Sequence, residues 1–426
     1  MRSAQERVRH DCRGLTLGID WVIAMSGVLI LGASHSGIAA AAGLRGFGYE
    51  GAVTVVSNEE ALPYHRPPLS KEALSTAEYS PALLRPENFY KTNRIDLERG
   101  TTIADVDIER RHVVASDGRR YAYDTLIFAC GAEPRRLPLE VDPQGAAFYL
   151  RTHDDFIRLS SRLARARSLA VIGGGLIGLE VAALAVAKGI RTTLVEAGER
   201  LMERTVSRSM AGYLLDRHQA RGLEVKLDSP VVSIRRDNAR NIDMVILGNG
   251  ELIEADLVVA AIGVVPNDHL ARRAGLSVKN GILASDQGRT DNRAVYAIGD
   301  CAAWFDADLG RHIRYEAVNP GQDQAKIAAA AIAGAPVPPQ RIPRYWSHQA
   351  EIQIQMAGDI HKSETEAVLK GPVSGAFSVL GLKDGRLVSV QSVNAARQFI
   401  RLQDLIGTDR DTLETALDVE FPPPRH

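Results

Sequence analysis

Residues Gly173 to Gly178 form a complete G-x-G-x-x-G motif. Glycines at this spacing allow a tight turn and bring backbone N–H groups at a helix start close to a pyrophosphate. Glu196 ends the next apolar segment, where its carboxylate would meet the ribose hydroxyls of an adenosine and repel a 2′-phosphate. The motif therefore predicts a site for NADH rather than NADPH.

A second Gly-rich motif lies near the beginning of the chain. Gly32 and Gly37 hold the first and third glycine positions, whereas Ser34 stands at the middle one. Asn58 and Glu59 follow the next apolar segment, where a ribose-binding acid is expected. A tight turn that binds no ligand is the alternative for this motif alone. Two such motifs in one chain predict a protein that binds two dinucleotides.

Both motifs need a strand before them and a helix after them. Unbroken apolar runs predict buried parallel strands at Val28 to Leu31 and at Leu169 to Ile172. The following helices and second strands are predicted at Ile38 to Arg45, Ala52 to Val56, Leu179 to Lys188 and Arg191 to Val195. These are two βαβ units.

A third candidate is Lys71, which ends the segment Leu-Pro-Tyr-His-Arg-Pro-Pro-Leu-Ser-Lys from Leu62. Its three prolines predict a stiff, extended backbone that holds one cation just before a helix start at Glu72. A surface connector with a solvated lysine is the alternative.

Further elements follow from the same patterns. Strands are predicted at 101–107, 111–115, 123–131, 224–227, 231–235, 244–247, 257–262 and 294–300, and helices at 206–221 and 325–333. Gly131 ends one of these strands, and Asp300 ends another, where an acid suits the ribityl hydroxyls of a flavin or an N-cap. Residues 341–426 show alternating strand patterns and a final helix.

The predicted fold class is α/β, with two Rossmann-like dinucleotide-binding domains and a small α+β C-terminal domain. Residues 1–25 form a non-core extension, and Met25 is the expected start of the folded protein. The two domains that bind FAD and NAD are then 26–138 with 264–337, and 139–263. The C-terminal domain is 338–426.

The composition argues against several classes of function. The 426 residues carry a net charge of −1, which argues against binding nucleic acid or an anionic membrane. No apolar run approaches the length of a membrane span. The three cysteines, Cys12, Cys130 and Cys301, are far apart in sequence, so neither a CxxC redox motif nor a metal site is expected, and the compartment is predicted to be the cytoplasm.

Two nucleotide sites imply hydride transfer from a nicotinamide to a second carrier, for which a flavin is the natural choice. Disulfide reductases of this architecture keep a reactive cysteine beside the flavin, but the stretch from Ala52 to Lys91 contains none. Electrons are therefore expected to leave toward an external acceptor.

With these motifs in this order, the chain resembles the FAD-dependent, NADH-specific ferredoxin or rubredoxin reductases of bacterial oxygenase systems. The resemblance covers roughly residues 26 to 410. It rests on the segments 62–71, 173–180, Tyr-Leu-Arg-Thr at 149–152, Tyr-Ala-Ile-Gly-Asp-Cys-Ala at 296–302 and Tyr-Trp-Ser at 345–347. It implies electron transfer from NADH through FAD to a [2Fe-2S] ferredoxin or a rubredoxin that serves a P450 or Rieske-type oxygenase.

The resemblance also implies roles for individual residues. Lys71 and Glu180 would pair near the reactive ring with Trp346 beside them, although an inter-domain salt bridge is the plainer alternative. Contacts to FAD are implied for Ser36, Arg66, Lys71, Ile103, Arg151, Asp300, Ala317 and Val318, and contacts to NAD for Gly174, Gly175, Leu176, Ile177, Glu196, Gly263 and Glu316. Arg85 and Lys326 are the implied docking residues for the iron–sulfur partner, with Arg397 and Arg401 as weaker candidates.

The chain departs from the family pattern at a few positions. Asn58 replaces an Asp, so Glu59 is expected to take the adenosine ribose; the other departures are Ser34, Cys130, Val265 and His348. Cys130 and Cys301 are expected to be buried small hydrophobes.

Two other functions stay open: an NADH oxidase or quinone reductase, and a redox signalling flavoprotein like apoptosis-inducing factor. The oligomeric state is expected to be monomer or homodimer.

Overall fold

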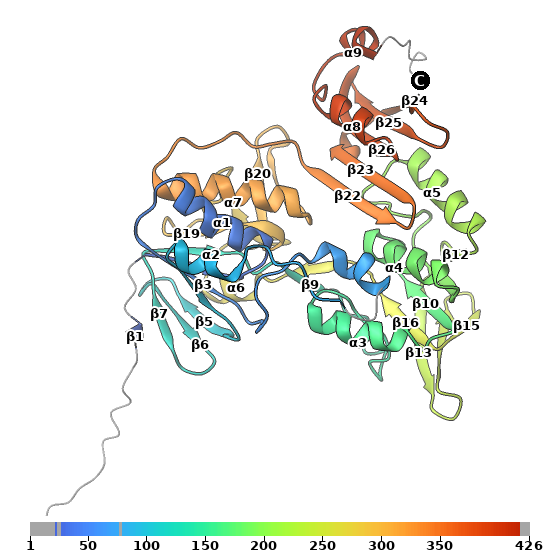
Figure 1. The fold of residues 1–426 in the computed structure, drawn as a ribbon, viewed down its shortest axis with the longest axis horizontal. Coiled ribbons are helices and arrows are strands. Elements are labelled where there is room, and N and C mark those ends of the chain that lie inside the picture. Colours follow the sequence, from blue (N-terminus) through green and yellow to red (C-terminus); the bar gives the residue numbers. More distant parts are fainter. Residues whose placement is uncertain (1–21, 24–26, 76–78, 418–426) are drawn as a thin grey trace, which may run out of the picture.

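The computed structural model of the protein describes residues 22–23, 27–75 and 79–417 (Figure 1). The predicted extension therefore lies outside the described residues except for Val22–Ile23. These two residues form β1, which pairs in parallel with β7 (Arg120–Ala122). Met25, the expected start, is also outside the described residues.

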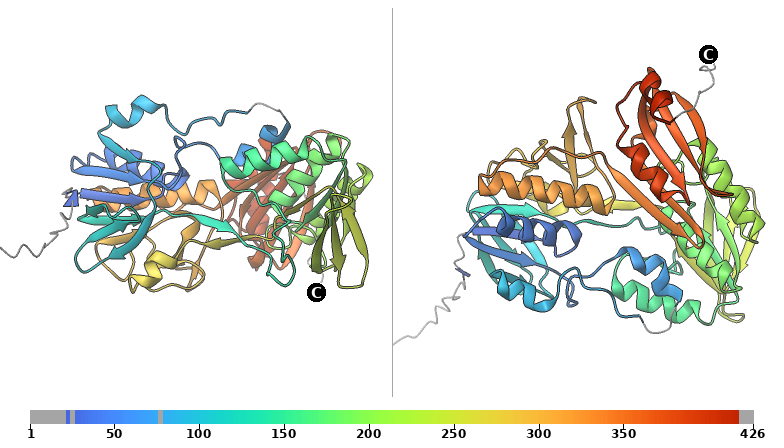
Figure 2. Two further views of the ribbon diagram at one scale, coloured as in Figure 1. Left: turned by 90° about the horizontal axis from the view of Figure 1, so that it is seen from below. Right: turned by 45° about the horizontal axis from the view of Figure 1, so that its top comes forward.

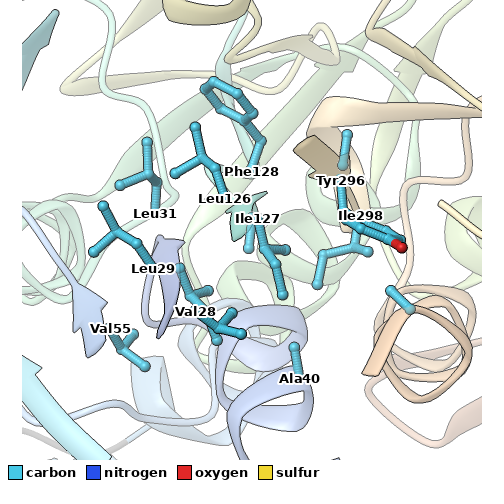
Figure 3. Packing of buried hydrophobic residues seen from close by; sticks show 14 of the residues in the cluster. Val28, Leu29, Leu31, Ala40, Val55, Leu126, Ile127, Phe128, Tyr296 and Ile298 are labelled. Carbon is cyan, nitrogen blue, oxygen red and sulfur yellow. The ribbon is translucent and has the colours of Figure 1, made fainter. Parts of the chain in front are cut away.

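A five-stranded parallel sheet forms the first nucleotide-binding region. Its order is β19-β8-β2-β3-β4, with β2 (Gly27–Leu31), β3 (Ala52–Val56), β4 (Ile95–Glu98), β8 (Thr125–Phe128) and β19 (Val295–Ala297). All five residues of β2 are buried, as expected for a strand covered on both faces. Figure 3 shows Leu29, Leu126 and Ile127 packed together in this core. Because β19 comes late in the chain, this sheet is completed only after the second nucleotide-binding region.

Two helices lie side by side on this sheet in Figures 1 and 2, α1 (His35–Gly46) and α7 (Val318–Ala333). Small residues permit their close approach: a Cβ built on Gly43 of α1 would lie 3.0 Å from the Cβ of Ala329 on α7. Gly334 ends α7 in the left-handed conformation that glycine adopts readily. The short helices α2 (Glu87–Thr92) and α6 (His269–Arg273) also belong to this region.

A four-stranded parallel sheet forms the second nucleotide-binding region. Its order is β12-β11-β10-β16, with β10 (Ser168–Ile172), β11 (Arg191–Val195), β12 (Glu224–Lys226) and β16 (Leu257–Ala260). The helices are α3 (His153–Leu163), α4 (Leu176–Ala187) and α5 (Arg208–Ala220). Thr152 and Asp155 form a capping box at the start of α3, and Ser207 caps α5.

Smaller strands complete both regions. β9 (Ala132–Pro134) and β17 (Val264–Pro266) pair antiparallel. The two segments that connect the nucleotide-binding regions therefore lie side by side. The remaining groups are β5 (Ile103–Asp107) and β6 (His112–Ala115) with β7; β13 (Val231–Asp237), β14 (Ile242–Leu247) and β15 (Leu252–Ala255); and β18 (Ile282–Ala284), β20 (Ala302–Asp306) and β21 (Arg311–Ile313).

The C-terminal region is an antiparallel sheet with two described helices, in agreement with the expected α+β fold. The order is β22-β23-β26-β25-β24, with β22 (Arg344–Gln349), β23 (Ile352–Gly358), β24 (Thr365–Lys370), β25 (Phe377–Lys383) and β26 (Arg386–Val393). The helices are α8 (Ala396–Gln403) and α9 (Arg410–Leu417). Figure 1 shows β22 close to α4, which places this sheet against the second nucleotide-binding region.

Several predicted boundaries were wrong. The segment 62–71 is not extended throughout, because Pro67–Ser70 form a 3₁₀ helix, η1, and Glu72–Ser75 form another, η2. Helices α4 and α7 begin at Leu176 and Val318, earlier than predicted. The predicted strand 294–300 ends at Ala297, and Gly299–Cys301 form the 3₁₀ helix η3; a fourth, η4, spans Ile360–Lys362.

Candidate functional site

The first Gly-rich turn connects β2 to α1. A Cβ at Gly37 would lie 1.8 Å from the carbonyl oxygen of Gly32, so only glycine fits where helix and strand meet. Gly32 has φ +113°, a conformation that also requires glycine. Ser34, in contrast, has φ −92° and ψ −163°, close to the values of Gly175 in the second motif. This is ordinary extended backbone, so serine at the middle position costs the fold nothing.

The Arg66 guanidinium lies at this turn. Its Nε donates to Ser34 Oγ at 3.1 Å, its Nη1 donates to the Arg151 carbonyl at 3.1 Å, and its Nη2 pairs with Glu59. Arg66 has helical backbone angles although Pro67 follows, which is unusual because proline disfavours that conformation in the preceding residue. The Arg66 carbonyl accepts from the Leu69 N–H at 3.0 Å, and the three partners hold the guanidinium group in place.

Glu59 accepts hydrogen bonds on both carboxylate oxygens. Arg66 occupies Oε1, and Tyr64 donates its hydroxyl to Oε2 at 2.6 Å. Asn58 is exposed. The backbone position that corresponds to Glu196 is Ser57, because Val56 accepts from Gly32 as Val195 accepts from Gly173. A role of Asn58 or Glu59 at a ribose stays a prediction.

A second cation, Arg151, lies at the same site. Its Nη2 pairs with Asp300 at 2.8 Å, while its buried Nε has no hydrogen-bond partner among the described residues. A Cβ at Gly299 would come within 2.5 Å of Ser36 Oγ, so the Ser36 side chain packs tightly against the Gly299 backbone. Two guanidinium groups, a helix N-terminus and one acid fit the pyrophosphate and the hydroxyls of FAD.

His35 is the first residue of α1 and is buried. Burial lowers its pKa to about 4, and His65, Arg66 and Arg151 act in the same direction. The ring is therefore neutral near pH 7, and its Nε2 is buried with no hydrogen-bond partner in the part of the chain that the structure describes.

Replacing Arg66 by lysine tests this arrangement. Lysine keeps the charge but cannot reach Ser34, Glu59 and the Arg151 carbonyl with one planar group. We expect FAD to bind about tenfold to a hundredfold more weakly, as measured by fluorescence titration during reconstitution.

Arg119→Lys is the matched control, because Arg119 also bonds three side chains, those of Glu98, Thr101 and Asp117, but does so outside this turn. Equal FAD affinity in wild-type protein and the Arg66 variant would show that Arg66 serves only the fold.

The second Gly-rich turn connects β10 to α4. A Cβ at Gly178 would lie 2.0 Å from the carbonyl oxygen of Gly173, which repeats the close packing of the first turn. Glu196 accepts from the backbone N–H of Gly174 at 2.6 Å and from that of Gly198 at 2.8 Å. The carboxylate is thereby fixed at the carboxyl end of β11, next to the glycine turn, as predicted from the sequence.

Other residues assigned to NAD surround this turn. Leu176 and Ile177 form the first residues of α4, and Gly263 follows β16 with φ +97°. Glu316 pairs with Arg204 at 2.9 Å and with Arg314 at 2.7 Å. It therefore joins the second nucleotide-binding region to the segment before α7.

Lys71 and Glu180 form a buried ion pair between the two nucleotide-binding regions. Lys71 Nζ lies 2.9 Å from Glu180 Oε2, and the side chains are 11% and 3% exposed. Lys71 Nζ also donates to the Pro67 carbonyl at 3.1 Å, so η1 fixes the ammonium group. Ser70 donates to the same Glu180 oxygen. The solvated-lysine interpretation of this segment is therefore wrong, and the salt-bridge interpretation describes the contact.

Strand β22 approaches the pair with alternating side chains. Ser347 and Gln349 are fully buried, whereas Trp346 is partly exposed and His348 is exposed. Ser347 donates to Glu180 Oε1 at 2.7 Å. Trp346 is adjacent to Ser347 in sequence, but its side chain lies on the other face of the strand. A position of Trp346 beside a flavin stays a prediction.

The other assigned residues are placed as follows. Ile103 begins β5, Gly131 follows β8 with φ +68°, and Ala317 and Val318 form the N-cap and first residue of α7. The docking candidates Arg85, Lys326, Arg397 and Arg401 are all exposed. Arg85 stacks on the Phe89 ring at 5.3 Å.

The two described cysteines are free thiols. Burial raises the pKa of Cys301 to about 12 and raises that of Cys130 as well, so neither is a ready thiolate. In the described part of the chain no cluster of three or more His, Cys, Asp or Glu could hold a metal ion. Among residues 22–23, 27–75 and 79–417, no helix is long and apolar enough to cross a membrane.

Four contacts at the site had no assignment from the sequence. Tyr64 orients Glu59, Ser70 and Ser347 bind Glu180, and Gln349 lies behind Ser347. A strand period of two places Ser347 and Gln349 on one face, but nothing in the sequence marks that face as the buried one.

Comparisons with known proteins agree with this geometry. Residues 26–334 match the family model described as pyridine nucleotide-disulphide oxidoreductase, and residues 344–420 match the one described as reductase C-terminal. The chain is 37% identical to rubredoxin-NAD(+) reductase of Pseudomonas putida, over 87% of this chain and 96% of that protein. It is 38% identical to rhodocoxin reductase of Rhodococcus erythropolis, over 92% of each chain.

A solved structure of the covalent complex between putidaredoxin reductase and putidaredoxin is also similar. The TM-score is 0.86 at 32% identity, and the match covers 92% of this chain and 95% of that chain.

Proposed function

The chain belongs to the pyridine nucleotide-disulphide oxidoreductase family and is a flavin-dependent oxidoreductase of the ferredoxin reductase kind, and we propose that it passes electrons from NADH to a small iron–sulfur protein. The partner is a [2Fe-2S] ferredoxin or a rubredoxin that serves a P450 or Rieske-type oxygenase. The observation that carries this proposal is the buried Lys71–Glu180 pair, which joins η1 to α4 and whose lysine lies in a segment without cysteine.

FAD, when bound, supplies a carrier that takes two electrons from NADH and releases them one at a time. The residues that would hold it are Arg66 and Arg151 at the pyrophosphate, with Ser34 and Ser36 at the start of α1 and Asp300 at the hydroxyls. The side chains of Arg66, Arg151, Ser34 and Asp300 are already held by hydrogen bonds and ion pairs, so this part of the site is preorganised.

At the NAD site, Glu196 selects NADH over NADPH. Its carboxylate, fixed by two backbone N–H groups, offers acceptors to the ribose hydroxyls and repels a 2′-phosphate. NADH is therefore the proposed electron donor.

Lys71 provides a fixed positive charge, and Glu180 holds it in place. We expect the ammonium group to favour negative charge on the reactive ring. Catalysis on this proposal consists of positioning and electrostatics, because no thiol lies between Ala52 and Lys91, and of the described cysteines Cys301 is buried and Cys130 partly buried.

The proposal is tested by anaerobic titration with NADH, followed by cytochrome c reduction with and without a panel of ferredoxins. We expect stoichiometric bleaching of the flavin and cytochrome c reduction that requires a carrier. Full-rate reduction without any carrier, or rapid NADH consumption in air, would instead support an oxidase or quinone reductase.

Arg85 tests the docking part of the proposal. Charge reversal, Arg85→Glu, should raise the KM for an acidic ferredoxin about threefold to tenfold and change its salt dependence. Turnover from NADH to ferricyanide should stay unchanged. Arg110→Glu, at an exposed turn between β5 and β6, is the control. Unchanged ferredoxin kinetics would remove Arg85 from the docking surface.

We further propose that the protein acts in the cytoplasm as a monomer or a homodimer. The free thiols of Cys130 and Cys301 support a reducing compartment.

A further inference from the structure

A line of buried polar side chains leads away from Glu180 into the protein. Glu180 itself accepts from Lys71 and Ser70 on Oε2 and from Ser347 on Oε1. Behind Ser347, the Gln349 Nε2 lies 3.2 Å from Ser347 Oγ. The Gln349 Oε1 lies 2.7 Å from the Nε2 of His218 on α5.

Every member of this line is buried. Ser347 and Gln349 are 0% exposed and His218 is 1% exposed. The line also joins distant parts of the chain: η1, the helices α4 and α5, and strand β22. Buried polar groups retain hydrogen bonds because leaving one unpaired is costly, so the orientations along the line depend on one another.

Those orientations follow from the charge of Glu180. An ionised carboxylate only accepts, so the single hydroxyl proton of Ser347 points to Oε1. The Ser347 oxygen must then accept from Gln349, which places the amide nitrogen toward Ser347. The amide oxygen consequently faces His218, and His218 must carry its proton on Nε2.

Charges around His218 favour the neutral ring. Burial lowers the pKa of His218, and the nearby Arg221 lowers it further, whereas the hydrogen bond to Gln349 raises it. On the same helix, Arg217 and Arg221 pair with Glu351 of the C-terminal region. The ring also lines a cavity of about 190 Å³ together with Arg221, Ala183 and Leu223.

We propose that His218 is a positioning residue for the Lys71–Glu180 pair and acts through Gln349 and Ser347. By donating from Nε2, it fixes the Gln349 amide, which in turn keeps the Ser347 hydroxyl on Glu180. Both carboxylate oxygens then stay occupied, and the negative charge stays opposite Lys71. This inference rests on the proposed function only for its consequence at the flavin.

The first test observes the tautomer of His218 in the intact holoprotein. Nitrogen-15 NMR of histidine-labelled protein should show a neutral His218 with its proton on Nε2 near pH 7. The variant Glu180→Gln can donate toward Ser347, so it should change the His218 resonances across the Gln349 link. The exposed His361 serves as the internal control and should not change. A proton on Nδ1, or no response to Glu180→Gln, would overturn the proposal.

The second test measures the consequence for the reaction. His218→Leu should slow the anaerobic reduction of the flavin by NADH about threefold to thirtyfold and shift the flavin midpoint potential. His218→Gln keeps an N–H donor and should recover part of both effects. Equal rates and potentials in wild-type protein and the folded leucine variant would contradict the positioning role.

The two tests separate this inference from the proposed function. Flavin reduction by NADH and the histidine tautomer need no protein acceptor. If every ferredoxin failed as an acceptor while the His218 response held, the proposed function would fail and the positioning role would stand.

Discussion

Glu180→Ala should both destabilise the protein and slow flavin reduction. The change leaves the Lys71 ammonium 11% exposed with no carboxylate partner, and loss of one partner of a buried ion pair costs about 3–5 kcal/mol. It also leaves Ser70 and Ser347 without their acceptor. The destabilisation is measured by chemical denaturation of the holoprotein, and the rate by anaerobic stopped-flow mixing with NADH.

The double variant Lys71→Met/Glu180→Leu separates the two effects. It removes both charges and replaces them with apolar groups, so it should recover part of the stability, although Ser70 and Ser347 still lack an acceptor. Flavin reduction should stay slow, by about tenfold or more, because the fixed positive charge is missing. A double variant that reduced its flavin at the wild-type rate would limit the pair to a structural role.

Coenzyme choice should depend on Glu196. In Glu196→Gln the amide oxygen can still accept from the Gly174 N–H, but the negative charge is lost. We expect kcat/KM for NADH to fall about tenfold to a hundredfold and that for NADPH to rise, because the repulsion of the 2′-phosphate is removed. Ferricyanide is a suitable acceptor, since it avoids any dependence on protein docking.

Glu199→Gln is the control for this experiment. Glu199 lies three residues after Glu196 in sequence, is exposed and pairs with Arg208. An unchanged preference for NADH in the Glu196 variant would show that another residue selects the coenzyme.

Much of the fold followed from local patterns in the sequence. Strands β2, β3, β10 and β11 were predicted to within one residue, because the first three are nearly unbroken apolar runs and β11 follows at the position of the second strand of a βαβ unit. The places of Gly37 and Gly178 in the two Gly-rich motifs were also predicted, since close packing of helix on strand requires glycine there. The boundaries of the domains stay predictions.

Short elements were harder to predict. The strands β15, β18, β20 and β21 have three to five residues each, too few to show a period. The start of α7 at Val318 was missed because Pro320 reads as a helix break, although proline is tolerated in the first turn. Arg66 adopts a helical conformation before proline at the start of η1, and its side-chain contacts with Ser34, Glu59 and Arg151 are likewise not indicated by the local sequence.

The sequence by itself determined the two nucleotide-binding units, the acid Glu196, and a cation, Lys71, in a segment without cysteine. A resemblance to a family suggested Glu180 as its partner. Only the tertiary structure decided how Glu180 is held, because Ser70, His218 and the pair Ser347 and Gln349 come from three separate stretches of the chain. Burial away from water makes these hydrogen bonds obligatory, and burial is a property of the assembled fold rather than of any local sequence.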